Sequence, residues 1–555
     1  MTVFENSIAL PDLENLSIEE QVAQMFVIRA SGHLFDQQIR FPIWEPPASE
    51  LRYLLQEVGV GGVLLPVGNA GELTVRAQQL QAWAKYPLLI ASDIEEGVGQ
   101  RFEGATWFPP PMALGALAAK DITRAQQYAE EMGSVTACEA LALGLNWILA
   151  PVVDVNNNPD NPVINIRSFG ETPEIVSSLV SAFIRGARKW PILTTAKHFP
   201  GHGDTAVDSH LQLPVLPHSP ERLNTIELPP FAAALAAGVD AVMSAHLVIS
   251  CWDAEKPATL SEKILTGQLR QKLGFDGLIV TDALVMGALA NKYAPEEAPL
   301  LALEAGADIL LMPLNPAAAI KAVCDAVAKA RISPARIRKS VERIWKAKRR
   351  IYEQGSEKNS NCSTPTVQES RKTEKQPPAF IEKIATPAAA KTVTSILRET
   401  MITGGTLPLR LEQSSASAGL RNLILVDDLL NCGFIGYHTP AIAFPQKLGY
   451  QLILADTQSA ATQIELLRKS PVPTLLQMFI RGNAFRDSAA LTAAAENLFK
   501  TLLISETLIA IAIYGSPYIL ERFLTLLPAN IPYVFSYAQS IPAQALALET
   551  LFGCF

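Results

Sequence analysis

The first part of the chain alternates short apolar runs with segments of helical period, and this alternation restricts the possible folds more than any other feature. Strands that alternate with helices form parallel βαβ units. Eight runs of strand length recur between residues 25 and 312: Met25–Arg29, Val60–Leu65, Leu88–Ser92, Trp147–Val153, Ile192–Ala196, Asp240–Ala245, Leu278–Thr281 and Asp308–Met312. Eight such units predict an α/β fold, a (β/α)8 barrel of the TIM type.

A second group of apolar runs follows a polar stretch. Residues 354–378 are nearly free of large apolar side chains, a composition typical of a flexible linker. Five further runs come after it: Asn422–Val426, Leu452–Ala455, Thr474–Phe479, Leu508–Ile513 and Tyr533–Phe535. A chain of 555 residues also exceeds what one hydrophobic core usually supports. We therefore predict a barrel domain at 1–350, a flexible polar linker at 351–385 and a second α/β layered-sheet domain at 386–555.

Charge and cysteine content disfavour several classes of function. A net charge of -8 and a pI near 5.6 give no basic surface for nucleic acid, so no nucleic-acid partner is expected. The six cysteines show no C-x-x-C spacing, which argues against a disulfide framework or a structural zinc site. Scattered thiols favour a reducing compartment.

Targeting and membrane signals are absent from the sequence pattern. The first residues lack the basic segment and apolar core of a secretory signal. No apolar run approaches the roughly 18 residues that a membrane helix needs. We expect a cytoplasmic protein without a membrane partner, and the sequence indicates no cofactor and no particular oligomeric state.

Polar residues follow several of the predicted strands directly. They are Asp93 after the third strand, Asp154 and Arg167 in the long connection after the fourth, Lys197 and His198 after the fifth, His246 after the sixth and Asp282 after the seventh. Barrel active sites are built at the carboxyl ends of the strands, so we expect these side chains to converge at one mouth.

The stretch from Lys197 to His210, KHFPGHGDTAVDSH, holds six ionisable residues in fourteen positions. One proline and two glycines interrupt regular structure, which predicts a loop. Asp208 and His210 are two positions apart and share a face if the loop is extended. A carboxylate can orient an imidazole, and histidine gives and takes protons near neutral pH. The alternative, a turn followed by a surface histidine, stays open.

The same loop carries side chains of the kind that bind metals. They belong to His198, His202, Asp204, Asp208 and His210. No recognised ligand spacing joins them, and Lys197 adds a positive charge beside them. We therefore expect no metal site.

Asp282 follows the apolar strand Leu278–Val280. An enzyme that cleaves a glycosidic bond with retention needs a carboxylate to attack the anomeric carbon and another group to protonate the leaving oxygen. Asp282 suits the first role, because the strand would hold its backbone at the barrel mouth. The alternative is that it caps a helix starting at Ala283. The convergence of the other strand-end groups favours the chemical role.

Two motifs carry a resemblance to a known family. KHFPGHGDTAVDSH and GFDGLIVTDALVMGA, Gly274 to Ala288, closely resemble signatures of the β-N-acetylhexosaminidase branch of glycoside hydrolase family 3. The similarity continues through Leu149–Val155, Asn165–Pro173 and Asp93–Arg101, so it covers most of residues 15–350. The resemblance implies a barrel that hydrolyses glycosides.

The resemblance also implies residue roles. Asp282 would be the nucleophile of a covalent glycosyl-enzyme intermediate, and His210, assisted by Asp208, the general acid and base. The hydroxyls of the terminal sugar would be bound by Asp93, Arg101, Arg167, Lys197 and His198. One departure stands at Glu96 and Val98, where the family commonly has Gly and Arg.

The implied function is a retaining, exo-acting β-N-acetylglucosaminidase that acts on a small carbohydrate, such as a cell-wall muropeptide fragment recycled in the cytoplasm. A β-N-acetylglucosaminide phosphorylase and a β-glucosidase are the alternatives within the family. A non-catalytic sugar-binding protein is the alternative from another class. The second domain resembles the family's C-terminal α/β domain loosely, from Ala388 to Lys391 onward, and we expect a structural or lid function for it.

Overall fold

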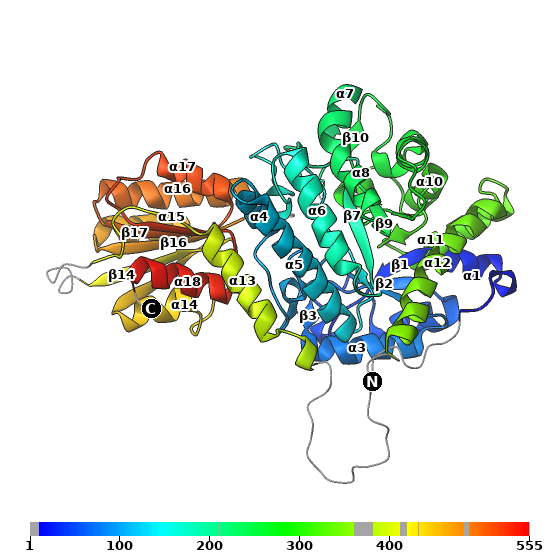
Figure 1. Cartoon of the computed structure of the whole chain (residues 1–555), viewed down its shortest axis with the longest axis horizontal. Coiled ribbons are helices and arrows are strands. Elements are labelled where there is room, and N and C mark those ends of the chain that lie inside the picture. The colour runs from blue at the N-terminus through cyan, green and yellow to red at the C-terminus, as the bar shows by residue number, and fades with distance from the viewer. Residues whose placement is uncertain are drawn as a thin grey trace, which may run out of the picture. The chain divides into compact units, whose positions relative to one another are not determined.

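The computed structural model describes residues 10–209, 211–359, 381–410, 419–430, 432–481 and 488–553. The chain forms two compact units (Figure 1). The first comprises Met1–Phe108, Asp121–Asn158 and Ser168–Ala390, and the second comprises Pro109–Lys120, Pro159–Arg167 and Lys391–Phe555. Most of the predicted linker, 351–385, lies outside the described residues. Its described parts hold the end of α12 (Pro334–Asn359) and a 3-10 turn at Ile381–Lys383, and the domain boundaries stay predictions.

Eight parallel strands form the sheet of the first unit. Along the sheet they are β11 (Leu278–Val280), β9 (Ala241–Ser244), β7 (Leu193–Phe199), β6 (Trp147–Ile148), β4 (Leu89–Ser92), β2 (Gly62–Leu64), β1 (Phe26–Arg29) and β12 (Leu310–Leu311). A parallel bridge between Val280 and Ile309 joins the two ends of the sheet, so the barrel is nearly closed. The predicted (β/α)8 barrel is confirmed.

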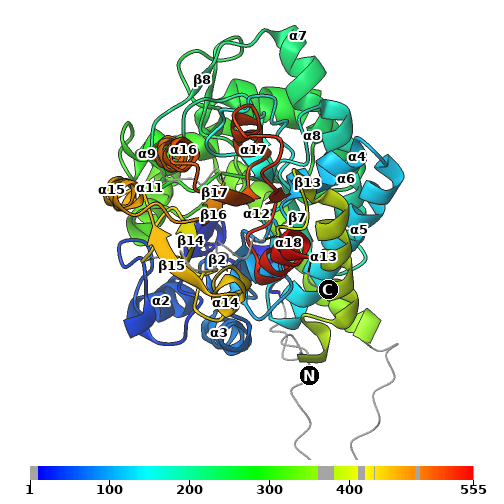
Figure 2. The same ribbon diagram turned by 90° about the vertical axis from the view of Figure 1, so that its left-hand side faces the viewer.

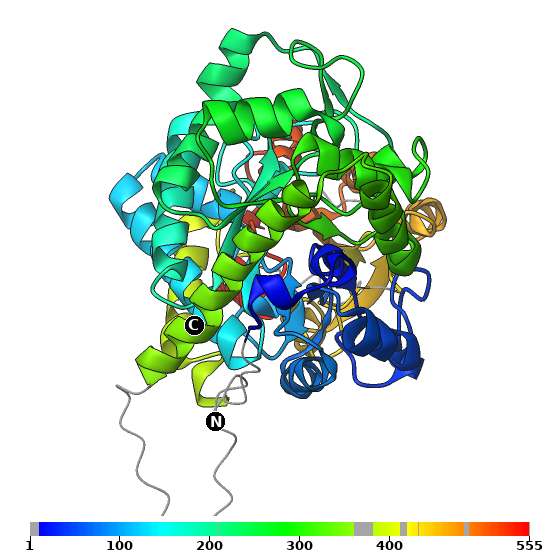
Figure 3. The same ribbon diagram turned by 90° about the vertical axis from the view of Figure 1, so that its right-hand side faces the viewer.

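Helices surround the barrel. The main ones are α1 (Ile18–Ala23), α2 (Ala48–Tyr53), α3 (Ala70–Trp83), α5 (Ile122–Ala142), α6 (Pro173–Ala187), α8 (Leu228–Ala236), α10 (Glu297–Ala305), α11 (Pro316–Ala328) and α12. Helix α12 lies across one side of the barrel (Figure 3), where Trp345 Nε1 donates to the carbonyl of Pro11 at 2.9 Å. Pro11, near the start of the described residues, is thereby tied to the last helix of the barrel unit.

Helices α5 and α6 pack unusually closely, side by side in Figure 1. Gly133 on α5 and Gly186 on α6 stand at the contact. A Cβ added at Gly186 would lie 1.9 Å from the carbonyl oxygen of Glu130, and one added at Gly133 would lie 2.1 Å from that of Phe183. The missing side chains therefore allow the two backbones to approach each other.

The strand that carries Lys197 and His198 is longer than predicted. We expected it to end at Ala196, but β7 continues to Phe199. Its pairing with β9 shifts register between Lys197 and Phe199, so His198 is the extra residue of a bulge. A bulge frees one backbone amide from the ladder and re-aims a side chain. Both residues thus stand inside the strand rather than beyond it.

The second unit is a six-stranded sheet with helices on both faces (Figure 2). The order is β13 (Ile402–Gly404), β18 (Tyr533–Ser536), β17 (Leu508–Gly515), β16 (Thr474–Ile480), β14 (Leu420–Leu425) and β15 (Tyr450–Ala455). Only β13 is antiparallel to its neighbour among the described strands. The five predicted strands are confirmed, while β13, three partly exposed residues, gave no apolar signal.

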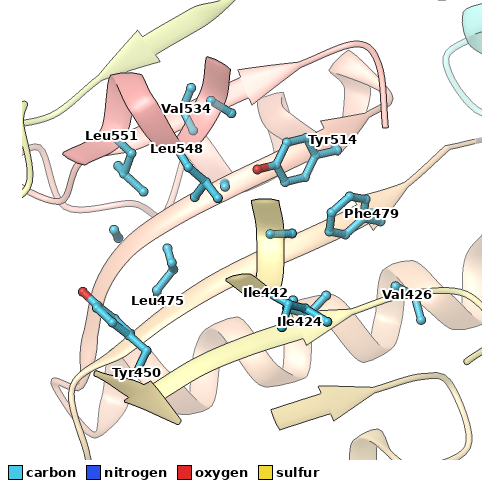
Figure 4. Close-up of a cluster of buried hydrophobic side chains, with 14 of the residues drawn as sticks. Ile424, Val426, Ile442, Tyr450, Leu475, Phe479, Tyr514, Val534, Leu548 and Leu551 are labelled. Atoms are coloured by element: carbon cyan, nitrogen blue, oxygen red, sulfur yellow. The ribbon is translucent and has the colours of Figure 1, made fainter. Parts of the chain in front are cut away.

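One face of this sheet packs on α14 (Pro440–Lys447) and α18 (Ile541–Phe552), and the other on α15 (Ala460–Lys469), α16 (Ser488–Ile504) and α17 (Pro517–Leu524). Figure 4 shows the core on the first face, where Leu548 and Leu551 lie over the strands. The rings of Phe479 and Tyr514 stack there, 4.4 Å apart. This unit therefore has a hydrophobic core of its own.

Candidate active site

A buried lysine between two carboxylates lies at the carboxyl end of the barrel strands. Lys197 Nζ is 2.7 Å from Asp93 Oδ1 and 2.5 Å from Glu95 Oε1. The side chains of Lys197 and Glu95 are buried, whereas that of Asp93 is 35% exposed. Burial of a charge is costly unless it is paired, and the two carboxylates supply that pairing. Asp93 remains open to an incoming hydroxyl group.

Two arginines stand beside Asp93. Arg101 Nε donates to the backbone carbonyl of Asp93 at 2.9 Å. Arg29, the last residue of β1, pairs with Glu45 at 2.9 Å and is coupled electrostatically to both Asp93 and Arg101. Burial lowers the pKa of the Arg29 guanidinium, and the neighbouring carboxylates oppose that change. Positive charge is thus arranged around one accessible carboxylate.

Asp154 contacts both the backbone and the ring of His198. The backbone N–H of His198 donates to Asp154 Oδ1 and Oδ2 at 3.1 and 3.2 Å, and the ring Nδ1 lies 2.8 Å from Oδ2. Burial would raise the pKa of Asp154, but His198 and the amide of His202 outweigh it and lower the pKa. An ionised carboxylate only accepts, so Nδ1 of His198 carries a proton and donates to Asp154.

The loop after β7, residues 200–209, is tied together by a neutral histidine. His202 Nε2 lies 2.8 Å from Ser209 Oγ, and its Nδ1 lies 2.8 Å from Thr205 Oγ1. Burial lowers the pKa of His202 to about 4, while the charge of Asp282 acts in the opposite direction. The ring is therefore neutral at pH 7, and it joins the two ends of the loop near the carboxylate of Asp282.

Asp208 is buried in this loop, and its carbonyl accepts from the amides of Leu211 and Gln212 at 3.0 Å each. His210 lies outside the described residues. The expected pairing of Asp208 with His210 thus stays a prediction.

Asp282 directly follows Thr281 at the end of β11. Its Oδ1 accepts from the backbone N–H of Ala283 at 2.7 Å, and the residue is half-buried. The next helix, α9 (Gly287–Ala290), has Met286 as its N-terminal capping residue, so the helix-cap alternative for Asp282 is wrong. The strand and the hydrogen bond from the amide of Ala283 help to hold its carboxylate at the barrel mouth.

Arg167 belongs to a 3-10 turn, Asn165–Arg167, in the second compact unit. Its Nη1 donates to the carbonyl of Val163 at 3.1 Å, and the residue is half-buried. Its predicted role in sugar binding stays a prediction.

Glu95 is the residue at this mouth that the sequence did not indicate, whereas Asp154 and His246 were expected there without an assigned role. Glu95 pairs with Lys197, and Asp154 with His198 on the neighbouring strand. The buried His246 contacts Thr259 Oγ1 at 2.7 Å and donates from Nε2 to the carbonyl of Ala283 at 3.0 Å. His246 therefore supports the backbone directly after Asp282. Its place at the end of a strand was the available signal, but the partner in each case comes from a distant segment.

The unusual Glu96 is fully buried and accepts from Trp107 Nε1 at 2.8 Å. Val98, the other departure, is also buried. The extra carboxylate is thus engaged with a tryptophan of the protein.

Within the part of the chain that the structure describes, no group of three or more His, Cys, Asp or Glu side chains is arranged to hold a metal ion. Across the same residues, no helix combines the length and apolar character needed to cross a bilayer.

Comparison with known proteins gives two family matches. Residues 17–347 match the glycosyl hydrolase family 3 N terminal domain, and residues 413–553 match the bacterial glycosyl hydrolase family 3 C-terminal domain.

Individual relatives are similar over the barrel. The chain is 38% identical over 291 residues to beta-hexosaminidase A from Pseudoalteromonas piscicida, covering 48% of each chain. It is 33% identical over 275 residues to a beta-N-acetylglucosaminidase/beta-glucosidase from Cellulomonas fimi, again covering 48% of each. The matched region thus spans about half the length of these two curated relatives.

A solved structure is similar over nearly the whole chain. It is a glycoside hydrolase family 3 beta-N-acetylglucosaminidase from Paenibacillus sp. str. FPU-7, with a TM-score of 0.75, 29% identity and coverage of 97% of both chains.

Proposed function

Because the chain belongs to glycosyl hydrolase family 3, we propose that it is a retaining, exo-acting β-N-acetylglucosaminidase. It removes a terminal N-acetylglucosamine from a glycoside through a covalent intermediate on Asp282. The natural substrates are small cell-wall fragments of the muropeptide type, met in the cytoplasm.

The observation that carries the proposal is the cluster of Lys197, Asp93 and Glu95 in the mouth where Asp282 also stands. Sugar hydroxyls donate and accept at once, so charge-assisted contacts to a carboxylate and a cation orient a ring strongly. Asp93, Arg101, Lys197 and His198 hold the terminal sugar in this proposal, with Arg167 as a further contact.

The reaction proceeds in two displacements. A carboxylate oxygen of Asp282 attacks the anomeric carbon while His210 gives its proton to the leaving oxygen, so the C–O bond to the leaving group breaks and an ester to Asp282 forms. Asp208 stabilises the imidazolium before that transfer. Neutral His210 then takes a proton from water, whose oxygen attacks the same carbon. The ester bond to Asp282 breaks, and the sugar is released with its original anomeric configuration.

One assay tests the reaction class. The protein is incubated with 4-nitrophenyl β-N-acetylglucosaminide and with the matching β-glucoside, each with and without phosphate, and the products are followed by proton NMR. The proposal expects preferred cleavage of the N-acetylglucosaminide and free N-acetylglucosamine that appears first as the β-anomer. The 1-phosphate would identify a phosphorylase, preference for the glucoside would identify a β-glucosidase, and binding without turnover would identify a sugar-binding protein.

The nucleophile is tested by trapping. A 2-fluoro glycoside with a good leaving group should esterify the protein, and peptide mapping should find the label on the peptide that contains Asp282. A label on another carboxylate would reject this assignment.

A further inference from the structure

A buried histidine to which the proposed reaction gives no part lies beside the strand of the nucleophile. His246 stands two residues beyond the end of β9 and is fully buried. Strand β9 pairs with β11, and the chain runs from β11 through Thr281 into Asp282. A buried polar side chain is costly unless its hydrogen bonds are made, so the partners of His246 indicate what it does.

Both ring nitrogens of His246 are engaged. Nε2 lies 3.0 Å from the carbonyl oxygen of Ala283, which can only accept, so Nε2 carries a proton and donates. Nδ1 lies 2.7 Å from Oγ1 of Thr259. That hydroxyl also lies 2.9 Å from Oγ of Ser244 and 3.0 Å from the carbonyl oxygen of Ala245. The ring is therefore held at Nδ1 and holds Ala283 at Nε2.

The support under the ring is itself well ordered. Thr259 is fully buried in a 3-10 turn, Ala258–Leu260. The first amide of this turn donates to the carbonyl of Leu247 at 2.8 Å. On its other side, Oγ of the buried Ser261 donates to Oδ2 of Asp253 at 2.7 Å. Hydrogen bonds on both sides thus fix the turn that carries Thr259.

Ala283 connects this support to the nucleophile. Its N–H donates to Oδ1 of Asp282 at 2.7 Å, and its carbonyl accepts both from His246 and from the amide of Met286, the latter at 3.0 Å. With the carbonyl held in this way, Ala283 presents its N–H to the carboxylate in a fixed direction. A displacement of a reacting group by about 1 Å can cost about a hundredfold in rate, so such support matters for the chemical step.

We propose that His246, anchored by Thr259, is a positioning residue for the nucleophile. Through the carbonyl of Ala283 it holds the carboxylate of Asp282 in the orientation from which it attacks the anomeric carbon. His246 itself touches no substrate. This inference rests on the proposed glycosidase function and adds to it a residue that acts on the chemical step rather than on sugar binding.

Two amide substitutions test the contact with Ala283. In His246→Gln the side-chain nitrogen can reach about the position of Nε2 and still donate, whereas in His246→Asn it is one methylene too short. On 4-nitrophenyl β-N-acetylglucosaminide, kcat should fall about thirtyfold in His246→Asn and about threefold in His246→Gln, while KM changes less than about twofold. Equal losses of kcat in the two variants would overturn the proposal.

His33→Asn is the matched control. His33 lies in the connection after β1, and its Nδ1 is 2.9 Å from Oε2 of Glu72, so this substitution also removes a histidine contact from the barrel unit. It should leave kcat unchanged.

The anchor is tested at Thr259. Thr259→Val keeps the shape of the side chain but removes the hydroxyl, and should lower kcat about tenfold. Thr259→Ser keeps the hydroxyl and should stay within about twofold of the wild type. Wild-type kcat in Thr259→Val would overturn the anchoring of His246 by this residue. If His246→Asn does not fold, this pair of variants still decides.

Hydrogen exchange followed by mass spectrometry gives a readout without turnover. The peptide that covers residues 282–290 should exchange about fivefold faster in His246→Asn than in the wild type, and close to the wild-type rate in His246→Gln, while peptides of the second unit are unaffected. Faster exchange with unchanged kcat would show a purely structural role and overturn the inference. Faster exchange in a protein whose wild type has no turnover would support the contact between His246 and Ala283 while rejecting the glycosidase proposal.

Discussion

The carboxylate of Asp282 accepts a hydrogen bond from the amide of Ala283 at 2.7 Å, a contact that an asparagine side chain can keep. Asp282→Asn should therefore fold like the wild type, whereas its neutral amide cannot form the ester. We expect kcat on an aryl N-acetylglucosaminide to fall about a thousandfold or more. Asp276→Asn, which changes an exposed carboxylate, is the control and should keep kcat. Retained turnover in Asp282→Asn would contradict the proposed mechanism.

His202 gives a prediction about stability and pH. Burial lowers its pKa from 6.5 to about 4, so between these values the unfolded chain binds a proton that the folded protein does not. The contribution of His202 to the free energy of unfolding is therefore fully present above pH 6.5. It is lost as the pH falls towards 4, by about 3 kcal/mol in total. In His202→Gln this dependence is absent.

Urea unfolding at pH 7.5, 6 and 5 measures this pH dependence of stability. The difference in unfolding free energy between wild type and His202→Gln should shift steadily in favour of the variant as the pH falls. His438→Gln, which removes an exposed histidine, controls for a general effect. Parallel curves for wild type and His202→Gln would show that the ring is not buried in its neutral form.

At the scale of elements, the loop 200–209 is held from outside by Arg222. Arg222 Nη2 lies 2.9 Å from Asp204 Oδ2 and 3.3 Å from Glu227 Oε1, and His218 Nε2 lies 3.0 Å from the same oxygen of Asp204. Burial raises the pKa of Glu227, although Arg222 opposes this. The loop that carries Asp208 is thus fastened to the helical segment after it.

If Asp208 has the proposed role, Arg222→Ala should free the loop and lower kcat about tenfold while KM changes less, because the variant would misplace a group of proton transfer rather than one of sugar binding. Arg222→Lys should recover part of the loss. Arg331→Ala removes a surface arginine that also pairs with two glutamates, Glu297 and Glu304, and should leave kcat unchanged. A change in KM alone for Arg222→Ala would contradict a role in placing the loop.

The contact between α5 and α6 depends on glycine. In Gly186→Ala the new Cβ meets the carbonyl oxygen of Glu130 at 1.9 Å, so the helices must separate, and we expect a loss of about 2 kcal/mol or more. Gly267→Ala is the control, since its Cβ meets nothing closer than 3.8 Å. Urea denaturation at pH 7.5 compares them. Equal stabilities would mean that the helices are not tightly packed.

At the scale of the whole molecule, two separate cores predict that a destabilising substitution lowers only the unfolding transition of its own unit. Leu548 is fully buried in the core of the second unit, and Leu548→Ala should cost about 2–5 kcal/mol there. Calorimetry should show that this variant lowers one unfolding transition, whereas Gly186→Ala lowers another. A single transition shifted equally by both would contradict independent cores.

The sequence was sufficient for the architecture because apolar periodicity and strand length are local properties. All eight barrel strands and five strands of the second sheet follow from it, whereas the short β13 carries too few apolar residues to be seen. The bulge at His198 and the contacts of Asp154 were not predictable, since both depend on which strands become neighbours. The family resemblance is confirmed by the matched domains.

The buried pairing of Lys197 with Asp93 and Glu95 also restricts how this protein can change over generations. Loss of the lysine alone would remove the cation that lies 2.5 Å from the buried carboxylate of Glu95, which is a costly change. A prior change of Glu95 to a neutral residue removes that penalty and leaves Asp93 to balance the lysine. Position 95 is therefore where an evolving lineage, or a directed-evolution library, can first change the charge of this cluster without leaving a buried carboxylate unbalanced.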